Sequence, residues 1–446
     1  MPTLALSMIV RDSEKWLAEC LQSVQGVVNE IVIADTGSND ATLSIAGQFG
    51  ARIIDFPWED DYAEARNASL NAVHSDWVLV LDADERLDPS SPRTLPPLLA
   101  SSTIQGYNVT LRNYFRGFVS RLWDRPTLPN RKCPPYARDY PVYADHENVR
   151  LFRRRPDIFF EGCVHESVLR ALYRINAEPA SSNLVIHHLG LSFDAEGLAR
   201  KYLRYRELGI KKLKQMPNDA QAHLELALEE SDHFSNEPAA LALLERACEL
   251  EPRMIEAWLF RARSLLRLGR NAEAVECARR VENVGSKSSM SAEVLGDAHF
   301  NLSNFTAARD AYRKALTRNP SNAELQSKLG LAEVQAGRGP AGLRQLREAL
   351  ALEPRSATVM DRTVSAFAVL GKLDEAAEVA LKKLEVIGPS AEGYLRAASL
   401  YAKLNSWERV MELLTSGLEH FPDHPKLNRA AEETRRRLQV QPAGPA

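Results

Sequence analysis

The chain has 446 residues, of which 45% are apolar and 26% charged, so it is long enough for two or more domains of ordinary globular composition. Its 56 basic and 59 acidic residues give a net charge of −3, which excludes the strongly basic surface expected of a protein with a nucleic-acid partner. The five cysteines are scattered and no apolar run reaches the ~18 residues of a membrane span, so we expect a cytoplasmic protein with no transmembrane segment, signal peptide or disulfide framework.

The first part of the chain alternates segments typical of strands and helices. Apolar runs predict strands over 4–10, 30–37, 51–57 and 76–85. The intervening segments have the periodicity and boundary residues of helices, over 13–24, 40–50 and 61–73. This alternation predicts an α/β domain with a mostly parallel sheet covered on both faces, and with ligands bound beyond the carboxyl ends of the strands.

Acidic residues follow two of the predicted strands. Asp35 comes after the second strand, and Asp82 and Asp84 follow the fourth in the stretch VLVLDADERL. Like charges at this spacing cannot be buried unpaired, so a positive group must meet them or they must stay in water. Two carboxylates separated by one residue on an exposed turn can bind Mg²⁺ or Mn²⁺ shared with phosphate oxygens, and a solvated acidic turn is the alternative.

The segments that follow are less regular. Residues 106–115 and 148–154 have strand patterns, and the stretch 117–145 between them, rich in Pro, Arg, Tyr and Asp, is predicted to be a loop. A helix over 194–215 bridges to the second half of the chain. Its basic residues are either solvated or cover an anionic lipid-linked molecule at a membrane surface: Lys201, Arg204, Arg206, Lys211, Lys212 and Lys214.

The second part of the chain repeats with a period of about 34 residues. Proline recurs in this register at Pro217, Pro252, Pro320, Pro354, Pro389 and Pro422. Small residues inside the units, such as Gly296 and Gly330, let paired helices approach closely, so this part resembles tetratricopeptide repeats. We predict about six repeats in an all-α superhelix over 221–424, after a domain over 1–195 and a linker helix over 196–220, and before a C-terminal helix and tail over 425–446.

Four ordered motifs of the first part also resemble a known family. They are LSMIVRDSEKWLAECLQSV, EIVIADTGSNDAT, FPWEDDYAEARNASL and DWVLVLDADERL. In order and spacing they are similar to the family-2 glycosyltransferases with a GT-A fold, and weaker similarity continues through ENVRLFRR, FEGCVHESV and VIHHLG to about residue 195. The resemblance implies inverting transfer of a sugar from a nucleotide-sugar donor, usually a UDP-sugar, with Mn²⁺ or Mg²⁺ as cofactor. The subgroup it most resembles joins this domain to tetratricopeptide repeats.

The resemblance also implies roles for individual residues on the donor side. The loop from Ser7 to Arg11 borders the nucleobase, Asp35 hydrogen-bonds the uracil or ribose, and Arg66 and Asn67 face the donor. Arginine suits this position because its guanidinium can neutralise phosphate charge or hold the acidic turn in place; a surface arginine on a helix is the alternative.

The metal ligands and the catalytic base are implied in the same way. Asp82 meets the ribose or the metal, Asp84 the metal, and His188 of VIHHLG supplies a third ligand unless it is a hinge histidine. Transfer with inversion needs a carboxylate base for the proton of the acceptor. Glu166 in VHES is the predicted base, with Asp145 and Glu147 as rivals, while its neighbour His165 contacts metal or phosphate, orients the acceptor, or is structural.

The acceptor and the role of the repeats stay open. The acceptor is a glycan, a lipid-linked molecule, or a protein or peptide side chain. The repeats dock the acceptor or a protein partner, or they mediate self-association. The competing hypothesis is a repeat scaffold whose transferase-like domain no longer reacts.

Overall fold

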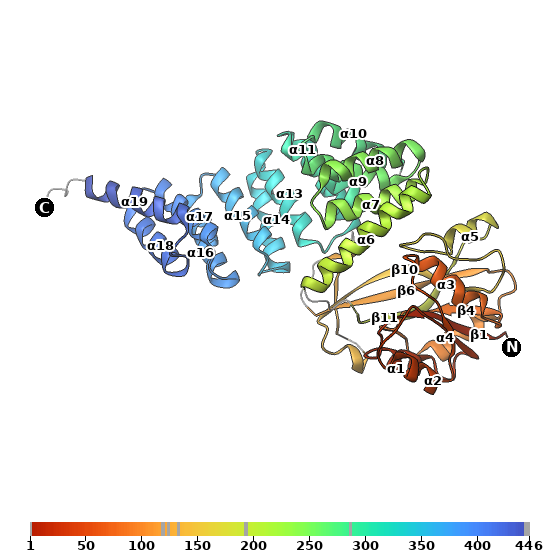
Figure 1. The fold of residues 1–446 in the computed structure, drawn as a ribbon. Helices are drawn as coiled ribbons and strands as arrows, with labels where there is room; N and C mark the ends of the chain where they lie inside the picture. Colours follow the sequence, from red (N-terminus) through yellow and green to blue (C-terminus); the bar gives the residue numbers. More distant parts are fainter. Residues whose placement is uncertain are drawn as a thin grey trace. The chain divides into compact units, whose positions relative to one another are not determined.

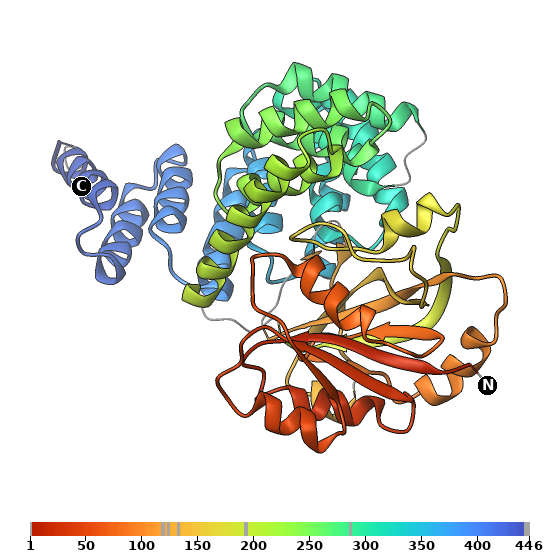
Figure 2. The same cartoon turned by 45° about the vertical axis from the view of Figure 1, so that its right-hand side comes forward.

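The computed structural model describes residues 2–116, 121–122, 125–131, 134–190, 195–284 and 288–440. The chain divides into two compact units, Met1–Glu251 and Pro252–Ala446. The first contains a β-sheet with helices on both faces, followed by three helices, and the second is built of helices (Figures 1 and 2). The predicted fold class, an α/β domain followed by an all-α superhelix, is confirmed.

The main sheet has nine strands within the described residues, in the order β3-β2-β1-β4-β10-β6-β11-β5, with β9 paired to β10. The bounds of these strands are β1 (Leu4–Val10), β2 (Glu30–Asp35), β3 (Arg52–Asp55), β4 (Trp77–Val80), β5 (Glu85–Leu87), β6 (Gly106–Phe115), β9 (Leu128–Pro129), β10 (Val142–Arg153) and β11 (Ala180–His188). The strands β1 to β4 are parallel, as predicted, because a helix returns the chain between each of them. Beyond β4 the sheet is mixed, since β10 runs antiparallel to both β4 and β6.

Helices cover both faces of this sheet. Leu4, Leu6 and Met8 of β1 belong to a core shared with α1 (Leu17–Val24), α2 (Thr42–Gln48) and α4 (Ser91–Leu99). Ala5 points the other way, into a second core with residues of α3 (Tyr62–Asn71) and α5 (Leu169–Arg174). Because both faces are buried, the ends of the strands are where this domain presents polar groups.

The predicted loop over 117–145 lies partly outside the described residues. Its described part contains β9, the short pair β7 (Arg121–Leu122) and β8 (Arg125–Pro126), and a 3₁₀ turn at Pro135–Ala137. Strand β10 starts at Val142 rather than near residue 148, because residues 142–149 pair with β6 without a break; the register shifts only between Val149 and Leu151.

Three helices complete the first unit: α6 (Ala195–Gln215), α7 (Ala220–Asp232) and α8 (Glu237–Leu250). Some of the basic residues of α6 contact protein oxygens, while Lys214 is exposed to solvent. Lys211, for example, donates from Nζ to the backbone carbonyls of Glu59 and Asp60 at 2.9 and 3.1 Å, and Arg206 pairs with Glu230 at 2.5 Å. A basic helix face has the same sequence pattern whether it meets water or protein oxygens, so only the packing distinguishes the two.

The second unit consists of antiparallel helix pairs followed by a last helix. Their bounds are α9 (Ile255–Arg267), α10 (Asn271–Asn283), α11 (Ser289–Asn301), α12 (Phe305–Arg318), α13 (Ala323–Gln335), α14 (Gly339–Leu352), α15 (Ala357–Val369), α16 (Leu373–Ile387), α17 (Ala391–Lys403), α18 (Trp407–His420) and α19 (Pro425–Val440). The first helix of four successive pairs begins with a side-chain cap on a backbone N–H, from Ser288, Asn322, Ser356 and Ser390. These caps recur every 34 residues, which is the period that the prolines predict.

Small residues set how closely the paired helices approach. A Cβ on Gly330 of α13 would lie 2.7 Å from Cγ of Leu346 in α14, and one on Gly296 of α11 would lie 2.5 Å from the ring of Tyr312 in α12. Glycine at these positions therefore fits the prediction that paired helices pack tightly within each repeat.

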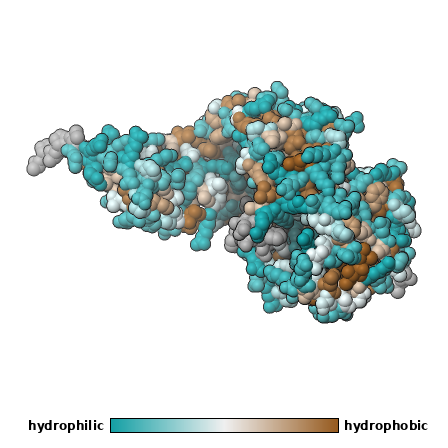
Figure 3. Space-filling view, in the orientation of Figure 1, coloured by the Kyte–Doolittle hydropathy of each residue, from teal (hydrophilic) through white to brown (hydrophobic). Residues whose placement is uncertain are grey.

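The surface is mainly hydrophilic on the face shown in Figure 3, and its hydrophobic residues lie in separate patches. Most large apolar side chains are instead buried on the two sides of the sheet and between the repeat helices. Over the described ranges, no helix combines the length and the apolar character needed to cross a membrane.

Candidate active site

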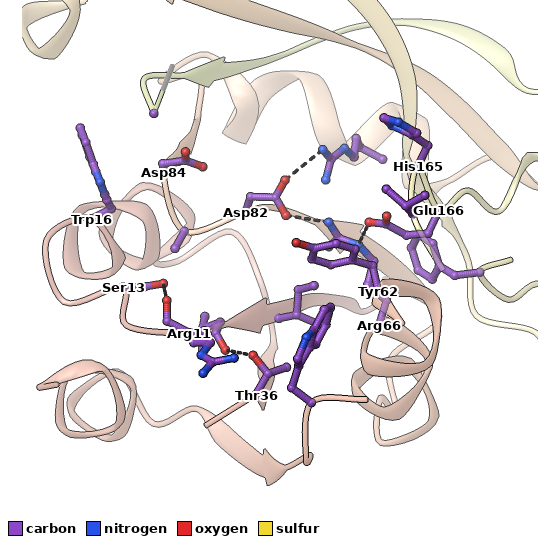
Figure 4. Close-up of a pocket in the computed structure, with 18 of the residues that line it drawn as sticks. Arg11, Ser13, Trp16, Thr36, Tyr62, Arg66, Asp82, Asp84, His165 and Glu166 are labelled. Atoms are coloured by element: carbon purple, nitrogen blue, oxygen red, sulfur yellow. Dashed lines mark hydrogen bonds and ion pairs between the residues drawn. The ribbon is translucent and has the colours of Figure 1, made fainter. Parts of the chain in front are cut away.

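A cavity of about 690 Å³ opens at the carboxyl ends of β1, β2 and β4, where the strand pattern predicts a ligand (Figure 4). The residues that follow these strands line it: Arg11, Asp12 and Ser13 after β1, Thr36 after β2, and Asp82, Ala83 and Asp84 after β4. Across from them, the lining includes Tyr62 and Arg66 of α3 and His165 and Glu166 of the segment between β10 and α5. The sheet and its loops thus bring together five separate stretches of the chain.

Asp82 lies between two arginines. Its Oδ1 accepts a hydrogen bond from Nη2 of Arg66 at 2.7 Å, and its Oδ2 accepts one from Nη2 of Arg150 at 3.3 Å. Burial by itself would raise the pKa of Asp82, but the charges of the two guanidinium groups outweigh it and hold this pKa well below the usual range. Asp82 is therefore an ionised carboxylate whose two oxygens are both engaged.

Arg66 connects Asp82 to Glu166. Its Nε donates to Oε1 of Glu166 at 2.5 Å, and only 8% of its side chain is exposed. Its remaining nitrogen, Nη1, is buried with no hydrogen-bond partner among the described residues. A buried guanidinium with two bound carboxylates and one unused donor is suited to binding a further oxygen at the cavity.

Glu85 is the most deeply buried acid of the turn, with 1% of its side chain exposed. Its Oε2 accepts the backbone N–H of Asp82 at 2.9 Å, and its Oε1 lies 3.2 Å from Nη2 of Arg150. Burial raises the pKa of Glu85, Arg150 lowers it and the charge of Asp82 raises it again, which leaves it at about 7. Glu85 thus fixes the backbone of the acidic turn by accepting the N–H of Asp82.

Asp84 points to a different partner, His188. Oδ2 of Asp84 lies 3.3 Å from Nε2 of His188, and the two side chains are 26% and 21% exposed. Nδ1 of His188 lies 2.8 Å from Oδ1 of Asn113, an acceptor, so Nδ1 carries a proton and Nε2 is the nitrogen turned to Asp84. The acids of VLVLDADERL therefore each meet a cationic or imidazole group, which is what their spacing requires.

Gly190 makes the contact between Asp84 and the end of β11 possible. A Cβ at position 190 would lie 1.5 Å from Oδ2 of Asp84, so no other residue fits without moving this carboxylate. The backbone N–H of Leu189 donates to the carbonyl of Asp84 at 3.1 Å. The sequence HHLG thus supplies an imidazole and the space for the carboxylate beside it.

The fit of this site to a divalent cation rests on Asp84 and His188. In this structure Nε2 donates to Asp84, and once it has lost that proton, Nε2 and the carboxylate oxygen are suitable ligands for Mn²⁺. The hydrogen bond to Asn113 orients the ring as metal-bound histidines require. Asp82 differs, because both of its oxygens bind arginines. Among the described residues no group of three or more His, Cys, Asp or Glu side chains is arranged to hold a metal ion, so further ligands must come from the donor or from water.

Several residues expected on the donor side lie behind the cavity wall. The hydroxyl of Ser7 is buried 2.8 Å from that of Ser69, and Asn67 exchanges two hydrogen bonds with the backbone of Phe160. The carboxylate of Asp35 accepts hydrogen bonds from the backbone of Gly37 and Ser38, as well as from the Ser38 hydroxyl. None of these three predicted residues is among those that line the cavity, whereas Arg11 and Arg66 are.

Of the three carboxylates considered as base, Glu166 lines the cavity. Asp145 lies on β10 and makes a bidentate pair with Arg112, with both N–O distances at 2.8 Å. Glu147, further along β10, is exposed and is not among the lining residues.

Four residues of the site were not singled out from the sequence: Arg150, Asn113, Tyr62 and Tyr205. The sequence could have pointed to Arg150, because it lies between the apolar Val149 and Leu151 of a predicted strand. An arginine buried in such a strand requires an acidic partner. The other three had none, because an asparagine in a strand and tyrosines in helices are equally common as structural residues.

Comparison with known proteins agrees with this division of the chain. A family model described as glycosyl transferase family 2 matches residues 6–171, and a tetratricopeptide repeat model matches residues 237–288, 293–341 and 327–392. A TPR repeat-containing protein of Synechococcus elongatus is 36% identical over 203 residues, which cover 44% of this chain and 44% of that protein.

Two further relatives are named as glycosyltransferases. The lipopolysaccharide core biosynthesis glycosyltransferase LpsC of Rhizobium meliloti is 35% identical over 126 residues, or 26% of this chain and 46% of its own. The SPbeta prophage-derived glycosyltransferase SunS of Bacillus subtilis is 23% identical over 226 residues, or 49% of this chain and 47% of its own. The chain thus spans less than half the length of each of these relatives. Residues 6–171 therefore form a domain that matches glycosyl transferase family 2, and tetratricopeptide repeats follow it between residues 237 and 392.

Proposed function

We propose that this glycosyltransferase is metal-dependent and inverting, and that it moves a sugar from a UDP-sugar donor to an acceptor hydroxyl. The observation that carries the proposal is the arrangement in one cavity of a paired carboxylate and imidazole, Asp84 and His188, next to the buried guanidinium of Arg66. The first pair suits a divalent cation and the arginine suits a phosphate oxygen, and a nucleoside diphosphate needs both.

On the donor side, Arg11 and Thr36 line the end of the cavity next to β1 and β2, where the base and ribose would bind. Asp35 acts through the turn at Gly37 and Ser38 that its carboxylate holds. Asp84 and His188 would hold Mn²⁺ or Mg²⁺, which when bound neutralises charge on the diphosphate as it leaves. The Nη1 donor of Arg66, unused by the protein, is available to a phosphate oxygen.

On the acceptor side, Glu166 is the proposed base. Its Oε1 is bound to Arg66, so Oε2 is the atom to take the proton of the acceptor hydroxyl. The acceptor oxygen forms its bond to the anomeric carbon from the face opposite the diphosphate, the bond from that carbon to the diphosphate oxygen breaks with its electron pair, and the configuration inverts. Arg66 keeps Glu166 oriented for this step through the hydrogen bond to Oε1.

We propose the class of acceptor in part from the name of one relative. LpsC is named as an enzyme of lipopolysaccharide core biosynthesis, which supports a glycan or a lipid-linked molecule as acceptor, and a protein or peptide side chain is the other acceptor that we propose. The repeats would dock that acceptor or a protein partner, or join two copies of the chain. The buried thiols of Cys20 and Cys163 are the observation on which we base the proposal of a cytoplasmic setting.

The test is a donor screen on the full-length protein. Release of nucleoside diphosphate from UDP-glucose, UDP-GlcNAc, UDP-galactose and GDP-mannose is measured with Mn²⁺ and with chelator. We expect metal-dependent release from at least one UDP-sugar, and loss of that release in Asp84→Asn. A protein that releases no diphosphate from any of the four donors would instead fit a scaffold with an unreactive transferase domain.

A further inference from the structure

One wall of the cavity comes from outside the segment that matches the transferase family. Tyr205 of α6 lines the cavity together with Tyr62 and His165, whereas the family match ends at residue 171. The rings of His165 and Tyr205 meet edge to face, with their centroids 5.5 Å apart. The helix that precedes the repeats therefore contributes to the site itself, and does more than link two domains.

This helix is firmly attached to the loop that carries His165 and Glu166. Lys212 of α6 is 4% exposed and donates from Nζ to the carbonyl of Val164 at 2.9 Å and to Glu225 of α7 at 2.6 Å. Gly162 leaves the space for this lysine, since a Cβ there would lie 2.8 Å from Nζ. The loop is thus held by α6, and α6 in turn is tied to α7.

His165 has a backbone conformation that is rare for residues other than glycine. Its φ is 51°, in the left-handed region, which persists where the surroundings impose it. Glu161 and Ser167 close the loop around it by exchanging two backbone hydrogen bonds, of 3.1 and 3.2 Å. The imidazole lies at the edge of the cavity beside Glu166, with 40% of the side chain exposed (Figure 4).

Glu229 of α7 lies near this imidazole. Its Oε1 lies 3.7 Å from Nε2 of His165, and its Oε2 lies 3.9 Å from Nε2 of His233. Glu229 is 9% exposed, and its Oε2 accepts no hydrogen bond from the described residues. A buried carboxylate that is incompletely hydrogen-bonded costs stability, so folding alone does not account for it.

We propose that Glu229 is a positioning residue of the active site, which orients the imidazole of His165 so that this ring holds the acceptor beside Glu166. The inference rests on the function proposed above and makes α6 and α7 part of the catalytic unit. With Nε2 turned to Glu229, the ring has Nδ1 left to hydrogen-bond the acceptor. No proton is transferred by His165; the base remains Glu166.

The chain offers a matched control in Glu230, the next residue of α7. It is also buried, but it pairs with Arg206 at 2.5 Å, whereas the carboxylate of Glu229 lies near His165. Loss of either carboxylate should lower stability, whereas loss of Glu229 alone should affect the reaction.

The experiment uses the full-length protein and water as the acceptor. Hydrolysis of UDP-glucose, or of whichever of the four donors above reacts fastest, is measured for Glu229→Gln, His165→Gln, the double variant and Glu230→Gln. Calorimetry with Mn²⁺ gives the Kd of UDP for each, and thermal unfolding reports folding. Should Glu229→Gln unfold, His165→Gln still gives the comparison, since its side chain lies at the surface.

We expect Glu229→Gln to lower kcat by about 10- to 100-fold, as misplacement of a reacting group does, with the Kd of UDP unchanged. The double variant should be no slower than His165→Gln, because both changes remove the same interaction. Equal kcat in Glu229→Gln and Glu230→Gln, or losses that multiply in the double variant, would overturn the proposal. A wild-type protein that hydrolyses none of the four donors overturns the proposed function instead, and this inference with it.

Discussion

Arg66 and Glu166 lie one hundred residues apart in the chain, yet Nε of Arg66 donates a 2.5 Å hydrogen bond to Oε1 of Glu166. Nη2 of the same guanidinium binds Oδ1 of Asp82 at 2.7 Å. One planar side chain of α3 therefore sets the distance between the acidic turn after β4 and the loop between β10 and α5. The donor side and the acceptor side of the proposed reaction meet at this arginine.

Replacing Arg66 by methionine should destabilise the protein as well as inactivate it. Breaking a buried ion pair costs roughly 3–5 kcal/mol, and we expect about 2–4 here because Asp82 is partly exposed and keeps Arg150. Chemical denaturation of the two proteins measures this difference. Arg155→Met is the control, since Arg155 pairs with Asp157 at the surface and should change stability little. Equal effects of the two substitutions would contradict the role given to Arg66.

The pair Asp84 and His188 can be tested by metal-dependent binding of UDP. In the wild type, Mn²⁺ should increase the affinity for UDP by at least about tenfold, and Asp84→Asn or His188→Gln should remove that increase. Calorimetry with Mn²⁺ and with chelator measures it. Asp139→Asn, an exposed aspartate away from the cavity, should behave as wild type. An increase that persists in Asp84→Asn would place the metal elsewhere.

The identity of the base is decided by comparing two isosteric substitutions. Glu166→Gln should lower turnover by about 10²–10⁴-fold, because the amide cannot take the acceptor proton while Arg66 can still bind it. Asp145→Asn should disturb the pair with Arg112 but leave turnover within a few-fold. UDP affinity should stay nearly constant in both. Normal turnover of Glu166→Gln would indicate that Asp145 or Glu147 is the catalytic base instead.

The buried Glu85 predicts a dependence of stability on pH. Its pKa is about 7 in the folded protein, against 4.5 for an ordinary glutamate, so the folded state holds the proton more tightly than the unfolded state does. The stabilisation is complete below about pH 4 and is lost as the pH rises through about 7. Asp82, whose pKa is lowered, contributes the opposite change only below about pH 4.

Glu85→Gln carries no titrating proton and should lack this loss of stability between about pH 5 and pH 7.5, as measured by denaturation at several pH values. Glu419→Gln, an exposed glutamate of α18, should retain the wild-type slope. If the slope persists in Glu85→Gln, other groups are responsible for it.

A glycine-to-alanine substitution at Gly330 tests the packing of the repeats, and one at Gly47, in the first domain, is its control. Gly330→Ala should destabilise the second unit by about 1–3 kcal/mol, because its Cβ would lie 2.7 Å from Leu346. Gly47→Ala, within helix α2, has no atom within 4 Å of the added Cβ and should raise stability by about 0.5–1 kcal/mol through helix propensity. Denaturation followed by circular dichroism measures both, and a stabilising Gly330→Ala would contradict the tight packing of α13 on α14.

The prediction of the fold succeeded where a local pattern decides the structure. Apolar runs of neighbouring residues predicted the strands β1, β2, β3 and β4. A 34-residue period that recurs along the chain predicted the repeats. The prediction was incomplete for the second half of the sheet, since the antiparallel pairing of β10 with β4 joins residues more than 70 positions apart.

The sequence by itself determined that carboxylates follow strand β4, that they need positive partners, and that a histidine and a glycine stand near residue 190. Only the tertiary structure decided the partners, which are Arg66 and Arg150 for Asp82 and His188 for Asp84. It also turned Asp35 toward its own backbone turn, brought Tyr205 to the cavity and placed Glu229 near His165. The physical reason is that strand and helix patterns arise from contacts a few residues apart, whereas the partner of a buried charge is chosen by the packing of whole elements.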